Sequence, residues 1–250
     1  MNISGNTIFI PGATSGIGRG FAERFAKAGN EVIVAGRRQH LVDEVAASHE
    51  NIDGFVLDVT DPQSINDALI TIKKRYPETN VLFAVAGIQL PENLHNGEFL
   101  PTAEATVTTN LLGPIRLIAG LSELLARKDD AAIITVTSGL AFVPLPITPT
   151  YNATKAAIHS FTESLRVQLA DTNVQVIELV PPAVRTTLMN QQDLESAIPL
   201  EDYLDEAMAL FESQPDAEAI IVEGVKFLRY AEVNGNYDEL LRSLSSLSAG

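Results

Sequence analysis

The sequence predicts a doubly wound α/β fold, a three-layer α/β/α sandwich in which helices cover both faces of one parallel sheet. Short runs rich in β-branched residues alternate with amphipathic stretches of helical length. The apolar runs are continuous, which is typical of parallel strands covered on both faces. A glycine-rich turn follows the first run and opens the first helical stretch. Repeated βα units with right-handed crossovers lead to this architecture.

The order of elements can be followed along the chain. The expected strands are residues 7–10, 31–35, 54–57, 81–84, 132–136 and 174–179, with a further short strand at 219–222. The expected helices are residues 16–28, 39–48, 62–75, 102–127, 152–170 and 223–247. Gly29-Asn30 is expected to end the first helix, and Pro114 to kink or restart the fourth. Residues 185–215 are interpreted as a loop and helix beside the substrate.

Length and composition indicate one domain spanning residues 1–250, of which 46% are hydrophobic. No apolar run reaches the roughly 20 residues of a membrane helix, and the first residues lack the pattern of a signal peptide. Cysteine is absent, which excludes disulfides and thiolate metal sites. The four histidines lie apart from one another, so no metal site is predicted. We expect a cytoplasmic protein without a membrane partner.

The formal net charge is −15, and a surface this acidic repels phosphate backbones, which argues against nucleic acid as a partner. Residues 191–250 hold 13 acidic and 3 basic residues, so they carry −10 of this charge. We interpret this stretch as a solvated face, with an acidic docking surface as the alternative.

The glycine-rich turn has the spacing of a phosphate-binding loop. Gly12 permits a tight turn, Gly16 lets the backbone approach a pyrophosphate, and Gly18 lets the new helix pack against the sheet. The helix then presents free N–H groups and a positive dipole end to the phosphates. Because the turn follows a strand and opens a helix, we favour nucleotide binding in a Rossmann-like domain over a structural turn.

The end of the second strand, Ala35-Gly36-Arg37-Arg38, indicates which cofactor is bound. An acid at this position would bind the ribose hydroxyls of NAD, and none is present. Arg37 and Arg38 suit the 2′-phosphate of NADP, which guanidinium groups bind in a bidentate manner. NADP(H) is therefore preferred and NAD(H) stays possible, while two solvated arginines are the alternative. Asp58-Val59 is placed to meet the adenine, or else to cap the following helix.

Tyr151 and Lys155 are four residues apart on a predicted helix, so both lie on one face. Free tyrosine has a pKa of about 10, and a nearby ammonium lowers that pKa toward the range of general acid–base catalysis. Ser138 follows the fifth strand, at the sheet edge where open α/β folds bind ligands.

With Gly12, Gly16 and Gly18 in the loop, and with Asn110, Ser138, Tyr151 and Lys155 in order, residues 5–187 resemble the short-chain dehydrogenase/reductase family. Residues 137–142 and the helical C-terminus are most similar to its DltE-like oxidoreductases. The resemblance implies that Tyr151 transfers a proton, that Ser138 binds the substrate oxygen, that Lys155 binds the nicotinamide ribose and lowers the pKa of Tyr151, and that Asn110 holds a relay water. It also implies cofactor contacts from Thr14, Ser15, Ile17, Ala86, Gly87, Val184 and Thr186.

Three positions depart from the family pattern: Pro11, Ala84 and Pro182. The first two remove polar ties between the first and fourth strands, which we expect apolar packing to replace. A glycine-rich final strand, which often builds a tetramer contact in the family, is not evident after residue 215. The resemblance therefore favours a homodimer through the helices at 102–127 and 152–170, with a tetramer left open.

The predicted activity is hydride transfer between a nicotinamide cofactor and a small-molecule carbonyl or alcohol. The substrate is expected between residues 88–100, 140–149 and 185–200. An apolar pocket there is expected from Leu140, Phe142, Leu188 and Met189, with ordinary core packing of these residues as the alternative. His159 is interpreted as an ordinary helix-face residue. The alternative function, motivated by the three altered positions, is a nucleotide-sensing protein that kept the fold and lost the chemistry. A structural interaction domain without a cofactor is a third hypothesis.

Overall fold

A parallel seven-stranded sheet forms the centre of the protein in the computed structural model, which describes residues 1–247 and the side chains up to residue 246. Its strands are β1 (Thr7–Pro11), β2 (Glu31–Gly36), β3 (Ile52–Val56), β4 (Val81–Ala84), β5 (Ala131–Val136), β6 (Val174–Val180) and β7 (Ala219–Ile221). The order β3-β2-β1-β4-β5-β6-β7 confirms the predicted doubly wound fold. The chain reverses direction between β1 and β4, and such folds open a crevice there at the carboxyl ends of the strands.

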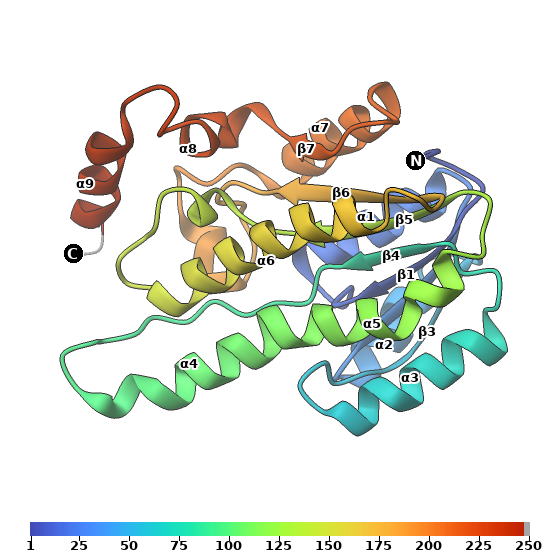
Figure 1. Cartoon of the computed structure of the whole chain (residues 1–250). Coiled ribbons are helices and arrows are strands. Elements are labelled where there is room, and N and C mark those ends of the chain that lie inside the picture. The colour runs from blue at the N-terminus through green and yellow to red at the C-terminus, as the bar shows by residue number, and fades with distance from the viewer. Residues whose placement is uncertain (248–250) are drawn as a thin grey trace.

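Helices cover both faces of this sheet (Figure 1). One face carries α1 (Gly16–Lys27), α2 (Gln39–Ala46) and α7 (Leu200–Ser213), and the other carries α3 (Pro62–Arg75), α5 (Gly113–Leu125) and α6 (Pro149–Gln168). The strand pleat produces this division, because successive side chains point to opposite faces. Ile8 and Ile10 enter the core with α1, whereas Phe9 between them enters the core with α3 and α5.

The long helix predicted at residues 102–127 is divided into three parts. α4 (Leu100–Val107) passes into a π-helical segment at Thr108–Leu112, and α5 follows with Pro114 in its first turn. The prediction that Pro114 restarts the helix is therefore confirmed. π-Helical turns are often associated with functional sites, and this one contains the buried Asn110.

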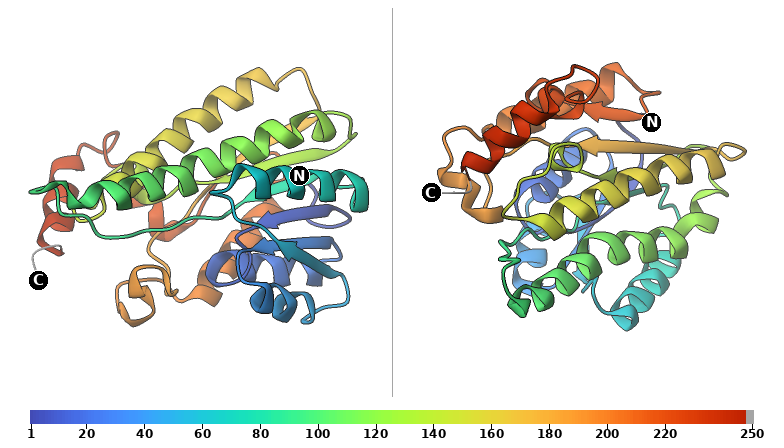
Figure 2. Two further views of the ribbon diagram at one scale, coloured as in Figure 1. Left: turned by 90° about the horizontal axis from the view of Figure 1, so that it is seen from below. Right: turned by 60° about the vertical axis from the view of Figure 1, so that its left-hand side comes forward.

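The helix predicted at residues 223–247 is also broken. A 3-10 turn at Glu223–Val225 leads into α8 (Lys226–Arg229), and α9 (Tyr237–Leu247) follows a turn in which Gly235 has φ +73°. This left-handed backbone conformation interrupts the helix and redirects the chain. Leu240, Leu241 and Leu244 then pack against a small cluster of Val143, Leu228 and Ala231, which joins α9 and α8 to the loop that precedes α6 (Figure 2).

None of the helices in residues 1–247 combines the length and apolar character needed to cross a bilayer.

Candidate active site

A cavity of about 800 Å³ opens at the carboxyl ends of the strands. Its lining comes from the turns that follow β1, β2, β3, β4, β5 and β6, as the doubly wound fold predicts. Every residue predicted to act in catalysis or cofactor binding lines this cavity, except Asn110. The roles of these residues stay predictions, but the fold places them around one space.

The glycine-rich turn enters the cavity in the conformation that its sequence predicts. Gly12 and Gly16 have φ values of +96° and +53°. Residues that carry a Cβ atom adopt such positive φ values only at an energetic cost. A Cβ atom on Gly12 would lie 2.6 Å from Cα of Ala86, and one on Gly18 would lie 2.5 Å from the Gly12 carbonyl oxygen. The Ser15 side chain makes no capping hydrogen bond to α1. The first N–H groups of α1 therefore stay available to an anion in the cavity.

Arg37 and Arg38 line the same cavity from the end of β2, and both are exposed. Within residues 1–246, neither guanidinium makes an ion pair or a side-chain hydrogen bond. A Cβ atom on Gly36 would lie 2.5 Å from Cγ2 of Thr14, so the end of β2 lies directly against the glycine-rich turn. Two free cations thus lie beside a loop suited to phosphate, which fits a cofactor with an additional phosphate.

Asp58 also lines the cavity, but its side chain has local partners. Its Oδ1 accepts hydrogen bonds from the backbone N–H of Thr60 at 2.9 Å and from the Thr60 hydroxyl at 2.7 Å. Asp61, rather than Asp58, caps α3 by accepting a hydrogen bond from the N–H of Gln63. The Asp58 side chain therefore stabilises the turn at residues 58–60, in which Val59 lines the cavity.

Tyr151 and Lys155 lie on successive turns of α6, with side chains that are 8% and 5% exposed. The Lys155 ammonium donates a hydrogen bond to the Val136 carbonyl at 2.7 Å and lies 5.5 Å from the centroid of the Tyr151 ring. Ser138 follows Val136 in the turn after β5, and it lies close enough to Tyr151 to influence the pKa of the phenol. The end of β5 and one face of α6 thus bring the three predicted catalytic side chains together.

Burial controls the ionisation of both groups on α6. It raises the pKa of Tyr151 to about 12, and the nearby Ser138 acts in the opposite direction. Burial also lowers the pKa of Lys155 to about 8. For Tyr151, desolvation of the phenol is the largest influence on the pKa, and the expectation that Lys155 lowers it stays a prediction. Tyr151 therefore holds its proton at neutral pH.

Asn110 lies behind the cavity wall rather than in it. Its Oδ1 accepts from the Ile88 N–H at 2.8 Å, and its Nδ2 donates to the Ile88 carbonyl at 2.8 Å and to the Thr154 hydroxyl at 3.3 Å. A Cβ atom on Gly87 would lie 3.4 Å from this Oδ1 and 3.9 Å from Nζ of Lys155. Asn110 therefore fixes the segment after β4 at a point close to the Lys155 ammonium.

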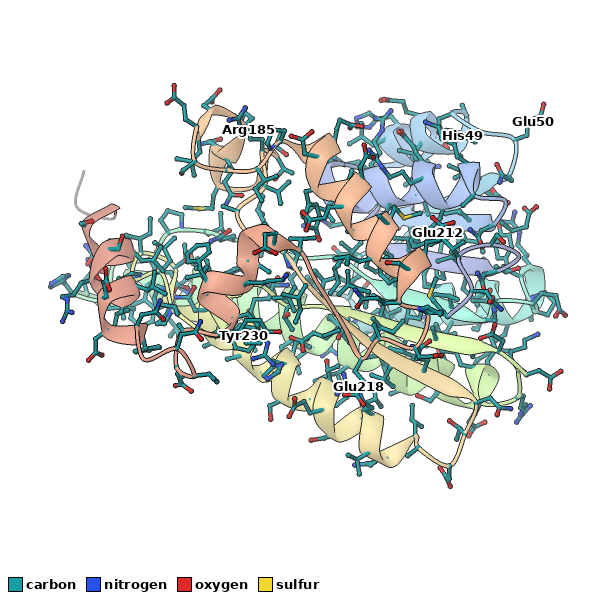
Figure 3. All side chains as sticks on the ribbon, turned by 90° about the horizontal axis from the view of Figure 1, so that it is seen from above. His49, Glu50, Arg185, Glu212, Glu218 and Tyr230 are labelled. Carbon is teal, nitrogen blue, oxygen red and sulfur yellow. The ribbon has the colours of Figure 1, made fainter. Side chains whose placement is uncertain are left out.

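Apolar packing surrounds one of the altered positions, Ala84, as expected. Ala84 is buried in the core cluster on the α3 face, Ala86 packs against that cluster, and Val85 packs against the cluster on the other face. Beyond Pro182, Val184 pairs with Ile198 and lines the cavity. The loop is closed by Arg185, which is labelled in Figure 3 and donates to the carbonyls of Ala197 at 3.0 Å and Glu195 at 3.0 Å. Thr186 lies against the glycine-rich turn, 3.4 Å from a Cβ placed on Gly16.

Two single side chains make contacts that the sequence did not indicate, and for Phe142 the alternative of core packing holds. Phe142 does not line the cavity, because its ring packs against His159 at 4.9 Å and beneath the Arg229 guanidinium at 4.3 Å. His159 is more than a helix-face residue, because its Nδ1 lies 2.9 Å from the carboxyl group of Glu178. Leu140, Leu188 and Met189 do line the cavity, as predicted.

Glu178 is the site-supporting residue that sequence reasoning missed. It is 2% exposed, and its Oε1 accepts a hydrogen bond at 2.7 Å from the hydroxyl of Thr137, the residue before Ser138. An acidic residue within the apolar run of β6 was the available signal, because buried carboxyl groups need specific partners. The contribution of the C-terminal segment to the cavity, through Phe227, Leu228 and Leu244, was also not predicted.

The arrangement matches known oxidoreductases. The model of the short chain dehydrogenase family matches residues 6–197. The chain is 37% identical over 255 residues to the uncharacterized oxidoreductase DltE of Bacillus subtilis (strain 168), which covers 98% of this chain and 99% of that protein. It is 30% identical over 183 residues to sulfoacetaldehyde reductase 2 of Chromohalobacter salexigens, which covers 72% of this chain and 73% of that protein.

The fold is shared with solved structures of the same kind. A short chain dehydrogenase from Burkholderia cenocepacia J2315 in complex with NADP has a TM-score of 0.82 at 24% identity, covering 98% of this chain and 99% of that one. A serine dehydrogenase complexed with NADP+ has a TM-score of 0.78 at 24% identity, covering 86% and 93% of the two chains. The chain therefore belongs to the short-chain dehydrogenase/reductase family of oxidoreductases.

Proposed function

We propose that this protein transfers a hydride between NADP(H) and a carbonyl or alcohol carbon, with Tyr151, Lys155 and Ser138 as its catalytic residues. The observation that carries the proposal is that these three side chains line the same cavity as the glycine-rich turn and the unpaired Arg37 and Arg38. The NADP complexes of proteins with the same fold support the choice of cofactor.

The cavity has the features that this cofactor requires. Backbone N–H groups at the start of α1 would hold the pyrophosphate, and Arg37 with Arg38 would hold the 2′-phosphate. Asp58 and Val59 would meet the adenine, and Val184 and Thr186 also line the cavity. When bound, the nicotinamide supplies or accepts the hydride.

The protein side of the reaction is a proton transfer. In the reducing direction, Tyr151 gives its phenolic proton to the carbonyl oxygen while the carbonyl carbon gains the hydride, so a neutral alcohol forms and the oxidised cofactor remains. Ser138 donates a hydrogen bond to the same oxygen and stabilises its developing negative charge. The pKa of Tyr151 keeps the phenol protonated at neutral pH, which this direction requires.

Lys155 and Asn110 would return a proton to Tyr151. The ammonium of Lys155 stabilises the tyrosinate formed during the transfer, and its lowered pKa lets it exchange a proton near neutral pH. Asn110 is proposed to hold a water that joins Lys155 to solvent, because the Asn110 amide and the Lys155 ammonium both lie beside Gly87.

Two further expectations belong to this proposal. The protein is proposed to be a homodimer that pairs through α4, α5 and α6, and to work in the cytoplasm, since it lacks cysteine. Both can be tested independently of activity by light scattering and by cell fractionation.

A nucleotide sensor without chemistry is the second candidate, and it is motivated by Pro11, Ala84 and Pro182. Titration with NADPH and with NADH, followed by nicotinamide fluorescence, tests the binding that both candidates share. Turnover of a carbonyl panel then separates them, since only the enzyme consumes NADPH. Binding of neither cofactor would contradict both candidates, and preference for NADH would contradict the roles of Arg37 and Arg38.

A further inference from the structure

The two ends of the cavity differ in charge. Arg37, Arg38 and Asp58 lie at the end formed by the turns after β2 and β3. Beyond Tyr151 and Lys155, the lining contributed by described residues is uncharged and is dominated by Leu140, Leu145, Ile147, Leu188, Phe227 and Leu244. A substrate bound beyond Tyr151 therefore meets mainly hydrocarbon.

Each of four cations is next in sequence to a residue that lines this end, but none is part of the lining: Arg185, Lys226, Arg229 and Arg242. Arg185 donates to the Ala197 and Glu195 carbonyls, which holds its guanidinium within the loop. Arg229 lies over the Phe142 ring, outside the cavity lining. A carboxylate, sulfonate or phosphate on the substrate would thus lose hydration at this end without gaining an ion pair, which is costly.

The C-terminal segment forms one wall of this end. Leu228, from α8, and Ser243 with Leu244, from α9, line the cavity. The wall has a fixed position relative to Ser138, because a Cβ atom on the neighbouring Gly139 would lie 2.7 Å from Cδ1 of Leu228. Leu244 packs against the cluster that contains Leu228. The distance between Leu244 and Ser138 is therefore set by this packing.

Exposed apolar side chains border the same end. Phe227 is 50% exposed and Leu194 is 44% exposed, and both line the cavity although they come from different segments. Single exposed apolar residues are ordinary on protein surfaces, but two that border one apolar cavity indicate a ligand-binding patch. An apolar group of a bound ligand that extends out of the cavity would cover both Phe227 and Leu194.

We propose that the substrate is an uncharged carbonyl compound with a long or bulky apolar group, and that Leu244 and Phe227 select this group. The inference rests on the proposed function, since it places the carbonyl at Tyr151 and Ser138. The apolar group then extends past Leu140 toward α9 and α8, where it is removed from water. Anionic carbonyl compounds of the same length are rejected.

The test uses matched ketones and matched variants of the full chain. The probes are 2-butanone, 2-octanone and 7-oxooctanoate, which has the length of 2-octanone with a carboxylate at its far end. Leu244→Ala is compared with Leu240→Ala, the same change on the same helix at a residue that packs in the core cluster and lies outside the cavity lining. Leu244→Lys adds a cation to the apolar wall. Steady-state reduction with NADPH and calorimetric binding to the enzyme–NADP+ complex are both measured.

The wild type is expected to favour 2-octanone over 7-oxooctanoate by at least about 100-fold in kcat/KM, because pocket contacts discriminate by about 10- to 200-fold per group. Leu244→Ala and Phe227→Ala should raise KM for 2-octanone about 10-fold and leave 2-butanone within about twofold. Leu240→Ala should leave the KM values for 2-octanone and for 2-butanone unchanged. Leu244→Lys should shift the preference toward 7-oxooctanoate by about 10-fold or more.

The outcomes separate the inference from the function. Equal kcat/KM values for 2-octanone and 7-oxooctanoate, or equal effects of Leu244→Ala and Leu240→Ala, would overturn the inference while turnover upholds the function. Calorimetric binding of 2-octanone that weakens in Leu244→Ala, without turnover, would overturn the function and uphold the apolar site. Absence of 2-octanone binding to the enzyme–NADP+ complex would overturn the inference.

Discussion

The carboxyl group of Glu178 lies 2.9 Å from Nδ1 of His159 and joins β6 to α6 behind the predicted catalytic residues. The same carboxyl group accepts a hydrogen bond from Thr137, immediately before Ser138. Because α6 also carries Tyr151 and Lys155, this contact links both halves of the predicted catalytic group. It supports the site without contacting the cavity.

Removing either partner of this contact should destabilise the protein. His159→Leu leaves the carboxyl group of Glu178 buried with Thr137 as its remaining partner, which should cost about 1–3 kcal/mol in free energy of unfolding. Glu178→Leu should cost a similar amount, and the double variant should cost less than the sum by about 1 kcal/mol or more. Urea denaturation of the four proteins at pH 7 measures this coupling. Strictly additive costs would show that the two side chains act independently.

Tyr151→Phe should abolish turnover while preserving cofactor binding. The change removes the phenolic proton donor, so kcat should fall on the order of 100- to 10,000-fold. NADPH affinity, measured by fluorescence, should stay within about twofold. Tyr203→Phe is the matched control, because Tyr203 is fully buried outside the cavity and its hydroxyl has no partner among the described residues. That control should keep full activity and gain stability, and normal turnover by Tyr151→Phe would refute the mechanism.

The pair Arg37→Ala/Arg38→Ala should lose affinity for NADPH selectively. Hydrogen bonds to charged groups contribute about 1.5–3 kcal/mol, so losing the contacts to a 2′-phosphate should weaken NADPH binding about 10- to 100-fold. NADH binding should change little, since it lacks that phosphate. Arg127→Ala, at an exposed position in the turn after α5, removes one positive charge outside the cavity lining. Equal losses for NADPH and NADH would contradict the assignment.

Lys155→Met should change the pH dependence of stability. Folding lowers the pKa of Lys155 from 10.5 to about 8, so the unfolded chain binds more protons between these values and wild-type stability rises with pH there. The penalty on the charged form is complete below pH 8, and at 1.36 kcal/mol per pKa unit it amounts to about 3 kcal/mol. The stability of Lys155→Met relative to wild type should therefore fall by about this amount between pH 7 and pH 10.5.

Urea denaturation at several pH values measures this difference. Lys74→Met, at an exposed position of α3, provides the control without a burial penalty. A difference between Lys155→Met and wild type that stays constant from pH 7 to pH 10.5 would contradict the prediction. Activity should be lost in Lys155→Met at every pH, so this variant separates stability from function.

The strands and the cavity could be predicted because their signals are local. The apolar run at Val81–Ala84 is a strand within those bounds, and the glycine-rich turn begins α1 at Gly16 as predicted. Once the βα units are recognised, the sheet order brings the turns after β1 to β6 to one edge without further information. This is why residues as distant as Arg37 and Val184 could be assigned to one site.

Features that depend on contacts between distant segments could not be predicted. The position of Phe142 depends on His159 and Arg229, and α9 packs on the cluster that contains Val143 across a turn that helical periodicity does not reveal. The pKa of Tyr151 also required the structure, because burial is the largest influence on it. Such features follow from tertiary packing, which local sequence patterns do not specify.

The participation of Leu244 in the cavity has a consequence during protein synthesis. The ribosome releases residues 12–155 well before Leu244. A nascent chain therefore contains the glycine-rich turn and the predicted catalytic residues before the cavity wall at Leu244 is synthesised. At roughly 5–20 residues per second, the interval between Lys155 and Leu244 lasts several seconds. The wall to which Leu228 and Leu244 contribute is therefore the last part of the cavity lining to be synthesised.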